Sequence, residues 1–534
     1  MTGNVQAVEL VFLLLLLFVV AFGALARKLQ VPYPIVLVIA GGLLGFVPGI
    51  PKIALNPDVI FFVILPPLLY SAAWVTSWRE FSFNLFSILL LAFGLVTFTV
   101  IGIAESAHWF FAGFDWKLGL VLGAVIAPTD ALAATSIAER VGIPKGITDL
   151  IEDESLVNDA TGLLALEFGI ALVLGNETPT VAGGITRLAY LTLGGLAVGL
   201  MVGWIADWVE HRIDDGPIEI AISILIPYAA YLTADRVRAS GVLAVVACGL
   251  YLSRRSSEFF SPQVRLQAWA VWEALDFILN GLVFVLIGLQ LPYVLAGIHG
   301  YSHRSLLLYG ALFSALVIAL RVVWVFPGAY IAYWTRTRLL HQKLTCPTAQ
   351  GILVLGWTGM RGVIALAAAI ALPQTLADGS PFPQRNLIVF LAFCVIFVTL
   401  VLQGLTLPWL VRILGVADQA GPNVEEEGAR REILETALQY LEGERKKDTA
   451  EFDSIYEDIV GHYRHRLTDV IGKDDAAGNL GPEHHKRLSR ISRDLLRLER
   501  QTAVRLRNEG RINDETLRQL EHELDLREAG PAHV

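Results

Sequence analysis

The chain has 534 residues, of which 54% are hydrophobic and 17% are charged, and its formal net charge at pH 7 is −9. A soluble protein carries charge on roughly a quarter of its residues, so the composition excludes an ordinary soluble protein. Apolar residues fill positions 7–413 and thin out after about residue 417. This predicts a transmembrane domain over residues 1–416 and a cytoplasmic helical regulatory tail over residues 417–534.

Apolar runs predict about thirteen transmembrane helices in an all-α membrane protein. The first run, Val8 to Ala26, lacks the basic start and short apolar stretch of a cleaved signal peptide, so we interpret it as a membrane span. The predicted helices cover residues 7–26, 33–47, 56–76, 81–112, 117–139, 147–173, 181–206, 217–235, 240–252, 263–290, 304–334, 348–372 and 385–413. Cys248, Cys346 and Cys394 lie in or beside separate apolar runs, which predicts neither a disulfide framework nor a metal site.

The fifth and twelfth predicted helices are interrupted by polar and helix-breaking residues. The first interruption is Pro128-Thr129-Asp130, and the second covers residues 358–362 (TGMRG). If helices 1–6 and 8–13 form two repeats, each interrupted helix is the fifth of its repeat, and the two run in opposite directions. Interrupted helices at matching places in inverted repeats indicate the substrate site of a transporter.

The basic residues of the loops predict the orientation of the chain in the membrane. With the N-terminus outside, most loop Lys and Arg residues fall on the inner side, as the positive-inside rule requires. The tail then lies in the cytoplasm, and a bacterial-type inner membrane is the predicted location.

The sixth predicted helix carries a group of polar residues on one broad face. Glu154 and Asn158 are four residues apart, as are Ser155 and Asp159. Asp159 lies about twelve residues into the helix, or ~18 Å, which places it near the middle of the bilayer. A carboxylate at that depth can hold either a proton or a small hard cation, so we interpret Asp159 as the exchange residue. Oxygen atoms of Thr129 and Ser155 suit Na⁺ as further ligands.

The remaining charged residues of the interruptions have two interpretations each. Asp130 begins a half-helix, so it either ligates the ion or compensates the half-helix dipole. Arg361 keeps its proton and cannot carry one, so it either neutralises Glu154 or faces the C-terminal end of a half-helix. Glu154, Asn158 and Arg361 are therefore predicted to support the site. Glu273, Asp276 and Arg321 are predicted to form a separate structural ion-pair network.

Four segments resemble the monovalent cation/proton antiporters of the NhaP and sodium/proton exchanger type. They are residues 65–70 (LPPLLY), 154–160 (ESLVNDA), 240–246 (SGVLAVV) and 359–365 (GMRGVIA). The resemblance implies a homodimer, elevator-like movement of a six-helix core, and Na⁺/H⁺ exchange serving pH homeostasis. Asn158 before Asp159 implies electroneutral exchange, because relatives with two aspartates there are typically electrogenic. Many relatives carry an acidic residue in helix 3 where this chain has Ser71, which leaves the selectivity among Na⁺, Li⁺ and K⁺ open.

Three rival functions remain open at this point. A cation channel would need a continuous pore, whereas one buried carboxylate between inverted repeats suits alternating access. An intramembrane aspartyl protease would use Asp130 and Asp159, and a sensor without transport is the third rival. The sequence predicts no enzyme activity, no cofactor and no nucleic-acid partner; its partners are the cation, H⁺ and membrane lipid.

The tail alternates charged residues with apolar ones at helical spacing. Ile433, Leu434, Ala437, Leu438 and Leu441 are predicted to share one face of a helix. Surface histidines at 462, 465, 484 and 485 are candidates for pH sensing. The sequence does not identify what the tail binds.

Overall fold

The computed structural model describes residues 2–47, 57–111, 114–175, 181–298, 301–376, 379–416 and 424–446, together with scattered positions between 456 and 520. Within these residues the regular elements are all helices, accompanied by a single isolated β-bridge between Thr375 and Pro381. The predicted all-α fold is therefore confirmed. Nine helical stretches in the described ranges are long and apolar enough to cross a membrane. The count of thirteen spans and their inverted symmetry remain predictions.

The chain divides into two compact units, Met1–Gln419 and Ala420–Val534. The second unit contains α20 (Val424–Arg445), along which Leu434 is buried but Ile433 is 66% exposed. The histidines at 462, 465, 484 and 485 lie outside the described residues.

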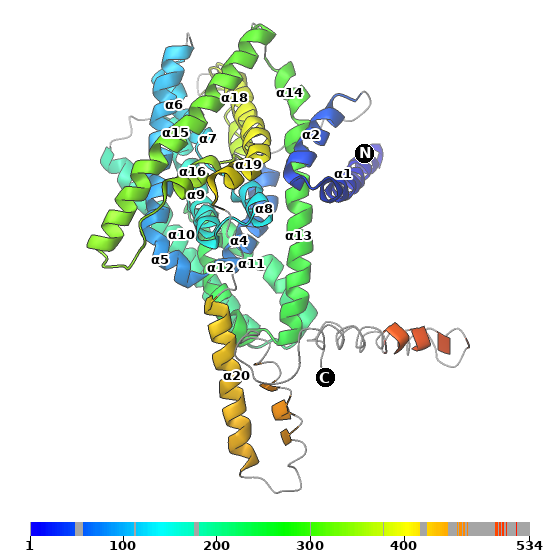
Figure 1. Cartoon of the computed structure of the whole chain (residues 1–534). Helices are drawn as coiled ribbons and strands as arrows, with labels where there is room; N and C mark the ends of the chain where they lie inside the picture. Colours follow the sequence, from blue (N-terminus) through cyan, green and yellow to red (C-terminus); the bar gives the residue numbers. More distant parts are fainter. Residues whose placement is uncertain are drawn as a thin grey trace. The chain divides into compact units, whose positions relative to one another are not determined.

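The first unit contains the remaining helices (Figure 1). Its α-helices are α1 (Thr2–Leu29), α2 (Tyr33–Gly45), α3 (Pro57–Val59), α4 (Leu65–Val75), α5 (Trp78–Leu89), α6 (Val96–Phe110), α7 (Trp116–Ile126), α8 (Ala131–Val141), α9 (Lys145–Leu174), α10 (Val181–Glu210), α11 (Gly216–Arg236), α12 (Gly241–Phe259), α13 (Pro262–Leu289), α14 (Leu291–Ala296), α15 (His303–Arg338), α16 (Ala349–Trp357), α17 (Val363–Ile370), α18 (Arg385–Val398) and α19 (Gly404–Leu414). Three π-helical turns join neighbouring helices: η1 (Ile60–Ile64), η2 (Leu90–Leu95) and η3 (Thr399–Gln403).

Two main apolar cores, with a third small cluster around Val264, hold the described part of the first unit together. The larger core draws buried side chains from α6, α7, α17 and α18, and the smaller one draws them from α4 and α12. The long helix α13 packs along α1 and α2 (Figure 1). Gly41 permits the close approach of α2, because a Cβ at this position would meet the backbone of Val285 on α13.

Both predicted interruptions are present, and they touch each other. Helix α7 ends at Ile126; Ala127 still has helical backbone (φ −63°, ψ −40°), and the helical hydrogen bonds stop at Pro128, which has no N–H to donate. Residues 358–362 separate α16 from α17, in line with the low helix propensity of their two glycines. The backbone N–H of Asp130 donates to the carbonyl of Met360 at 2.8 Å, which joins one interruption to the other.

Candidate cation site

A cavity of about 240 Å³ opens beside the crossed interruptions. Its lining includes Thr129 and Asp130 from the first interruption, Gly362 from the second, and Ser155 and Asp159 from α9. The structure therefore brings together four polar side chains that the sequence singles out as candidate ion ligands. They come from two segments separated in the chain, and α9 supplies two of them from the same face.

In the described part of the chain, Asp159 is a carboxylate of this cavity without a hydrogen-bond partner. Its residue is 4% exposed, and no hydrogen bond or ion pair of its side chain occurs within the described residues. Buried carboxylates are normally paired or hydrogen-bonded, because an unpaired charge out of water costs several kcal/mol. A group of this kind, facing a cavity, is suited to holding a proton or a cation.

Thr129 and Ser155 are held by mutual hydrogen bonds across the first interruption. The Ser155 hydroxyl donates to the Thr129 carbonyl at 2.9 Å and accepts from the Ala131 backbone N–H at 3.3 Å. The Thr129 hydroxyl accepts from the Asn158 side-chain amide at 2.6 Å and donates to Glu154 at 3.2 Å. These bonds satisfy backbone groups that the broken helix leaves free and fix the hydroxyl oxygens beside the cavity.

Arg321 of α15 is the partner of Glu154. Its Nη1 and Nη2 lie 2.6 and 2.8 Å from the two carboxylate oxygens, and both side chains are 1% exposed. The prediction that Arg321 pairs with Glu273 and Asp276 is wrong. The sequence offers little signal for the observed pair, because the two residues are 167 positions apart. Its one hint is that a fully buried arginine in an apolar helix needs a carboxylate.

Arg361 faces the end of a half-helix, as the second of its two interpretations requires. Its Nε donates to the carbonyl of Ile126, the last residue of α7, at 3.0 Å, and its Nη1 donates to the Gly359 carbonyl. Its backbone N–H donates to the Thr399 hydroxyl in η3 at 3.1 Å. The direct ion pair of Glu154 within the described residues is with Arg321, so neutralisation of Glu154 by Arg361 stays a prediction. A cation at the negative end of a helix dipole is favourable, so Arg361 stabilises the crossing.

Asp130 caps the second half-helix. Its Oδ1 accepts from the Leu132 backbone N–H at 2.9 Å, which is the usual geometry of an aspartate N-cap. The capping interpretation is thus observed. Asp130 also lines the cavity, so ion ligation stays a prediction for it.

Glu273 and Asp276 of α13, which were predicted to pair with Arg321, have other surroundings in the structure. Asp276 accepts a hydrogen bond from the Ser71 hydroxyl of α4, and it lines the same cavity as Asp159. Glu273 is exposed and lines a neighbouring cavity of about 370 Å³. Neither residue was predicted to belong to the site.

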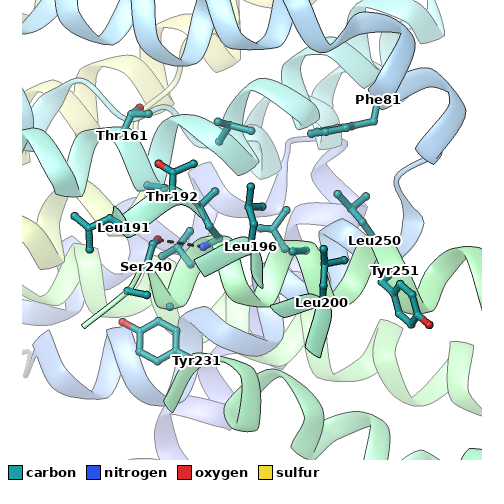
Figure 2. Close-up of a pocket in the computed structure, with 18 of the residues that line it drawn as sticks. Phe81, Thr161, Leu191, Thr192, Leu196, Leu200, Tyr231, Ser240, Leu250 and Tyr251 are labelled. Carbon is teal, nitrogen blue, oxygen red and sulfur yellow. Dashed lines mark hydrogen bonds between the residues drawn. The ribbon is translucent and has the colours of Figure 1, made fainter. Parts of the chain in front are cut away.

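A larger cavity, of about 900 Å³, lies elsewhere in the first unit (Figure 2). Its wall is mostly apolar and includes Leu191, Leu196, Leu200 and Leu250. Figure 2 shows Thr161, Thr192 and Ser240 among these leucines. Asp159 and both interruptions are absent from this wall, and size alone therefore does not identify the cation site.

Comparison with known proteins agrees with the resemblance carried by the four motifs. The sequence profile of the family described as "Sodium/hydrogen exchanger, transmembrane" matches residues 13–413. An uncharacterized Na⁺/H⁺ exchanger of Mycobacterium tuberculosis is 33% identical over 519 residues, covering 96% of this chain and 94% of that protein. The sodium, potassium, lithium and rubidium/H⁺ antiporter of Bacillus pumilus is 31% identical over 513 residues, covering 93% and 74%.

A solved structure shares the fold. The sodium proton antiporter MjNhaP1 from Methanocaldococcus jannaschii at pH 8 superposes with a TM-score of 0.62 at 19% identity. The superposition covers 77% of this chain and 99% of that structure.

Proposed function

The chain belongs to the sodium/hydrogen exchanger family, and we propose that it exchanges Na⁺ for H⁺ at Asp159 by alternating access. Members of this family are antiporters, so the protein is a membrane transporter of cations and protons rather than an enzyme. The interpretation of Asp130 and Asp159 as a protease pair is therefore dropped.

The observation that carries the proposal is the unpaired, buried Asp159 carboxylate beside the crossed interruptions. A single carboxylate there holds either a proton or a cation, and only a neutralised carboxylate crosses the bilayer at low cost. Thr129 and Ser155 supply further oxygens for Na⁺, and Asp130 either joins them or acts only as the N-cap. Because Asp159 is one carboxylate with Asn158 beside it, one cation would replace one proton, and the exchange would be electroneutral.

The supporting residues act on the shape of the site. The Glu154 carboxylate, which Arg321 holds in place, accepts hydrogen bonds from the Thr129 hydroxyl and the Asn158 side-chain amide. These bonds fix the orientation of the Thr129 hydroxyl beside the cavity. Arg361 stabilises the end of α7. An elevator-like movement of the helices that carry these residues would expose Asp159 to each side in turn, within a homodimer in the inner membrane and with the tail in the cytoplasm.

The proposal includes transport of cations other than Na⁺. The Bacillus pumilus relative is named for sodium, potassium, lithium and rubidium, and this chain lacks an acidic residue at Ser71. We therefore expect Li⁺ and K⁺ to be accepted as well, with lower apparent affinity than Na⁺.

Proteoliposomes loaded with a pH-sensitive dye test the proposal. An imposed pH gradient is expected to dissipate on addition of Na⁺, with saturation and without dependence on a K⁺/valinomycin voltage clamp. A channel would instead pass cations without moving protons, and its flux would follow the clamp. Flux of that kind would contradict antiport.

A further inference from the structure

We propose that Asp276 and Asn280 of α13 form a second wall of the cation path, on which the Asp276 carboxylate attracts the cation and passes it to Asp159. This inference rests on the proposed exchange at Asp159. It adds a carboxylate and an amide oxygen that neither the sequence analysis nor the family comparison assigns to the site.

The two carboxylate oxygens of Asp276 differ in their hydrogen bonding. One carboxylate oxygen accepts from the Ser71 hydroxyl, whereas Oδ1 is buried and has no hydrogen-bond partner in the described part of the chain. The hydrogen bond from Ser71 fixes the side chain, and a buried acceptor without a donor is suited to a cation. Such an oxygen is costly to keep unless something occupies it during the transport cycle.

Asn280 lies one helical turn further along α13 and lines the same cavity. It is 3% exposed, and no hydrogen bond of its side chain occurs among the described residues. Residues four apart share a face of a helix, so the amide of Asn280 and the carboxylate of Asp276 both belong to the cavity face of α13. A nine-tenths buried amide without a partner is a second, independent indication of a ligand.

Asp276 also stands between two cavities. Together with Ser71 and Val75, it lines both the cavity of Asp159 and the neighbouring one of about 370 Å³ that contains Glu273 and Arg265. Asp159 and Asp276 each lie 14 residues after the first residue of their helices, Lys145 and Pro262. This corresponds to ~21 Å of helix rise in both cases. On the predicted topology both helices start on the cytoplasmic side, so the two carboxylates lie at similar depth.

The arrangement also accounts for Ser71. The family resemblance implies an acidic residue at this place on helix α4, and here the hydroxyl instead donates to a carboxylate supplied by α13. The negative charge of the cavity is thereby retained, but it comes from a different helix. This charge therefore lies on α13, which is a different helix from those that carry Asp159 and the interruptions. Helix α13 packs along α2.

The test compares Asp276→Asn with the wild-type protein in the proteoliposome assay. Asparagine still accepts the Ser71 hydrogen bond, so the substitution removes the charge and little else. We expect the KM for Na⁺ to rise about tenfold, because the unit charge that attracts the cation to this wall is removed. The maximal rate should stay within about twofold, because Asp159 still performs the exchange. Glu167→Gln is the matched control, because Glu167 pairs with Arg187 away from this cavity.

A double variant, Ser71→Asp with Asp276→Ser, returns the carboxylate to α4 and is expected to bring the KM back towards the wild-type value. An unchanged KM in Asp276→Asn, or a double variant whose KM stays as high as that of Asp276→Asn, would overturn the inference. If the wild-type protein shows no cation-dependent proton flux, the proposed exchange itself fails. In that case, Na⁺-dependent thermal stabilisation of wild type but not of Asp276→Asn would still support a cation site at α13, and equal stabilisation would refute it.

Discussion

Replacing Arg321 by Met is expected to destabilise the first unit by about 3–5 kcal/mol, because it leaves Glu154 as a buried charge without its partner. The structure gives the reason for so large a value. Both side chains are 1% exposed, and the two carboxylate oxygens of Glu154 each accept from Arg321 at 2.6 and 2.8 Å. The remaining donors, Thr129 at 3.2 Å and Asn158 at 3.4 Å, are neutral and distant, so they cannot replace the guanidinium.

The assay is thermal unfolding in detergent, followed by intrinsic tryptophan fluorescence. At ~2 °C per kcal/mol, the expected fall in Tm is roughly 6–10 °C. Arg187→Met is the matched control, because Arg187 pairs with Glu167 at 3.0 Å but the two side chains are 36% and 53% exposed rather than buried. That exposed pair should contribute less than about 1 kcal/mol.

A double variant separates the charge from the shape of the side chains. Adding Glu154→Gln to Arg321→Met removes the orphaned charge, so the double variant should be more stable than Arg321→Met alone. The reasoning is refuted if Arg321→Met and Arg187→Met lower the Tm equally. It is also refuted if adding Glu154→Gln to Arg321→Met lowers the Tm by as much again.

Three further predictions concern the crossing and the exchange residue. Gly362→Ala should abolish exchange, because the new Cβ would collide with the Asp130 side chain, whereas Gly146→Ala, which has open space, should exchange normally in the same assay. Thr129→Val should raise the KM for Na⁺ about five- to tenfold, the effect of one lost hydrogen-bonding group, and an unchanged KM in the dye assay would remove Thr129 from the ligand set. Because a proton and Na⁺ compete for Asp159, the KM for Na⁺ should rise up to tenfold per pH unit on the acidic side of the profile, and a pH-independent KM would contradict competition.

The local features of the site could be predicted because composition specifies them directly. Pro128 and the glycines at 359 and 362 each lie beside a charged residue inside an apolar run, which marks both interruptions, whereas Pro227, Pro327 and Pro408 lie within continuous helices. The spacing of Ser155 and Asp159 sets a common face once α9 is a helix. Burial of Asp159 followed from its place in an apolar run. These inferences need only neighbouring residues.

The pairings across the bundle could not be predicted. Arg321 and Glu154 meet because α15 packs against the interruption at residues 358–362, and no pattern of apolar residues encodes which buried charges will face each other. The same holds for Ser71 and Asp276, which are 205 positions apart. The three π-helical turns were also missed, because a turn of this kind adds one residue without a distinctive composition. One of them, η3, places Thr399 against Arg361.

Simultaneous measurement of proton and ²²Na⁺ flux in proteoliposomes containing Asp159→Asn tests the central claim most directly. Asparagine preserves the size of the side chain, so the protein should reconstitute with an unchanged Tm. We predict that both fluxes disappear together, because the one group that alternates between proton and cation has been removed. Coupled Na⁺ and proton movement that persists in this variant would show that the exchange takes place on another residue.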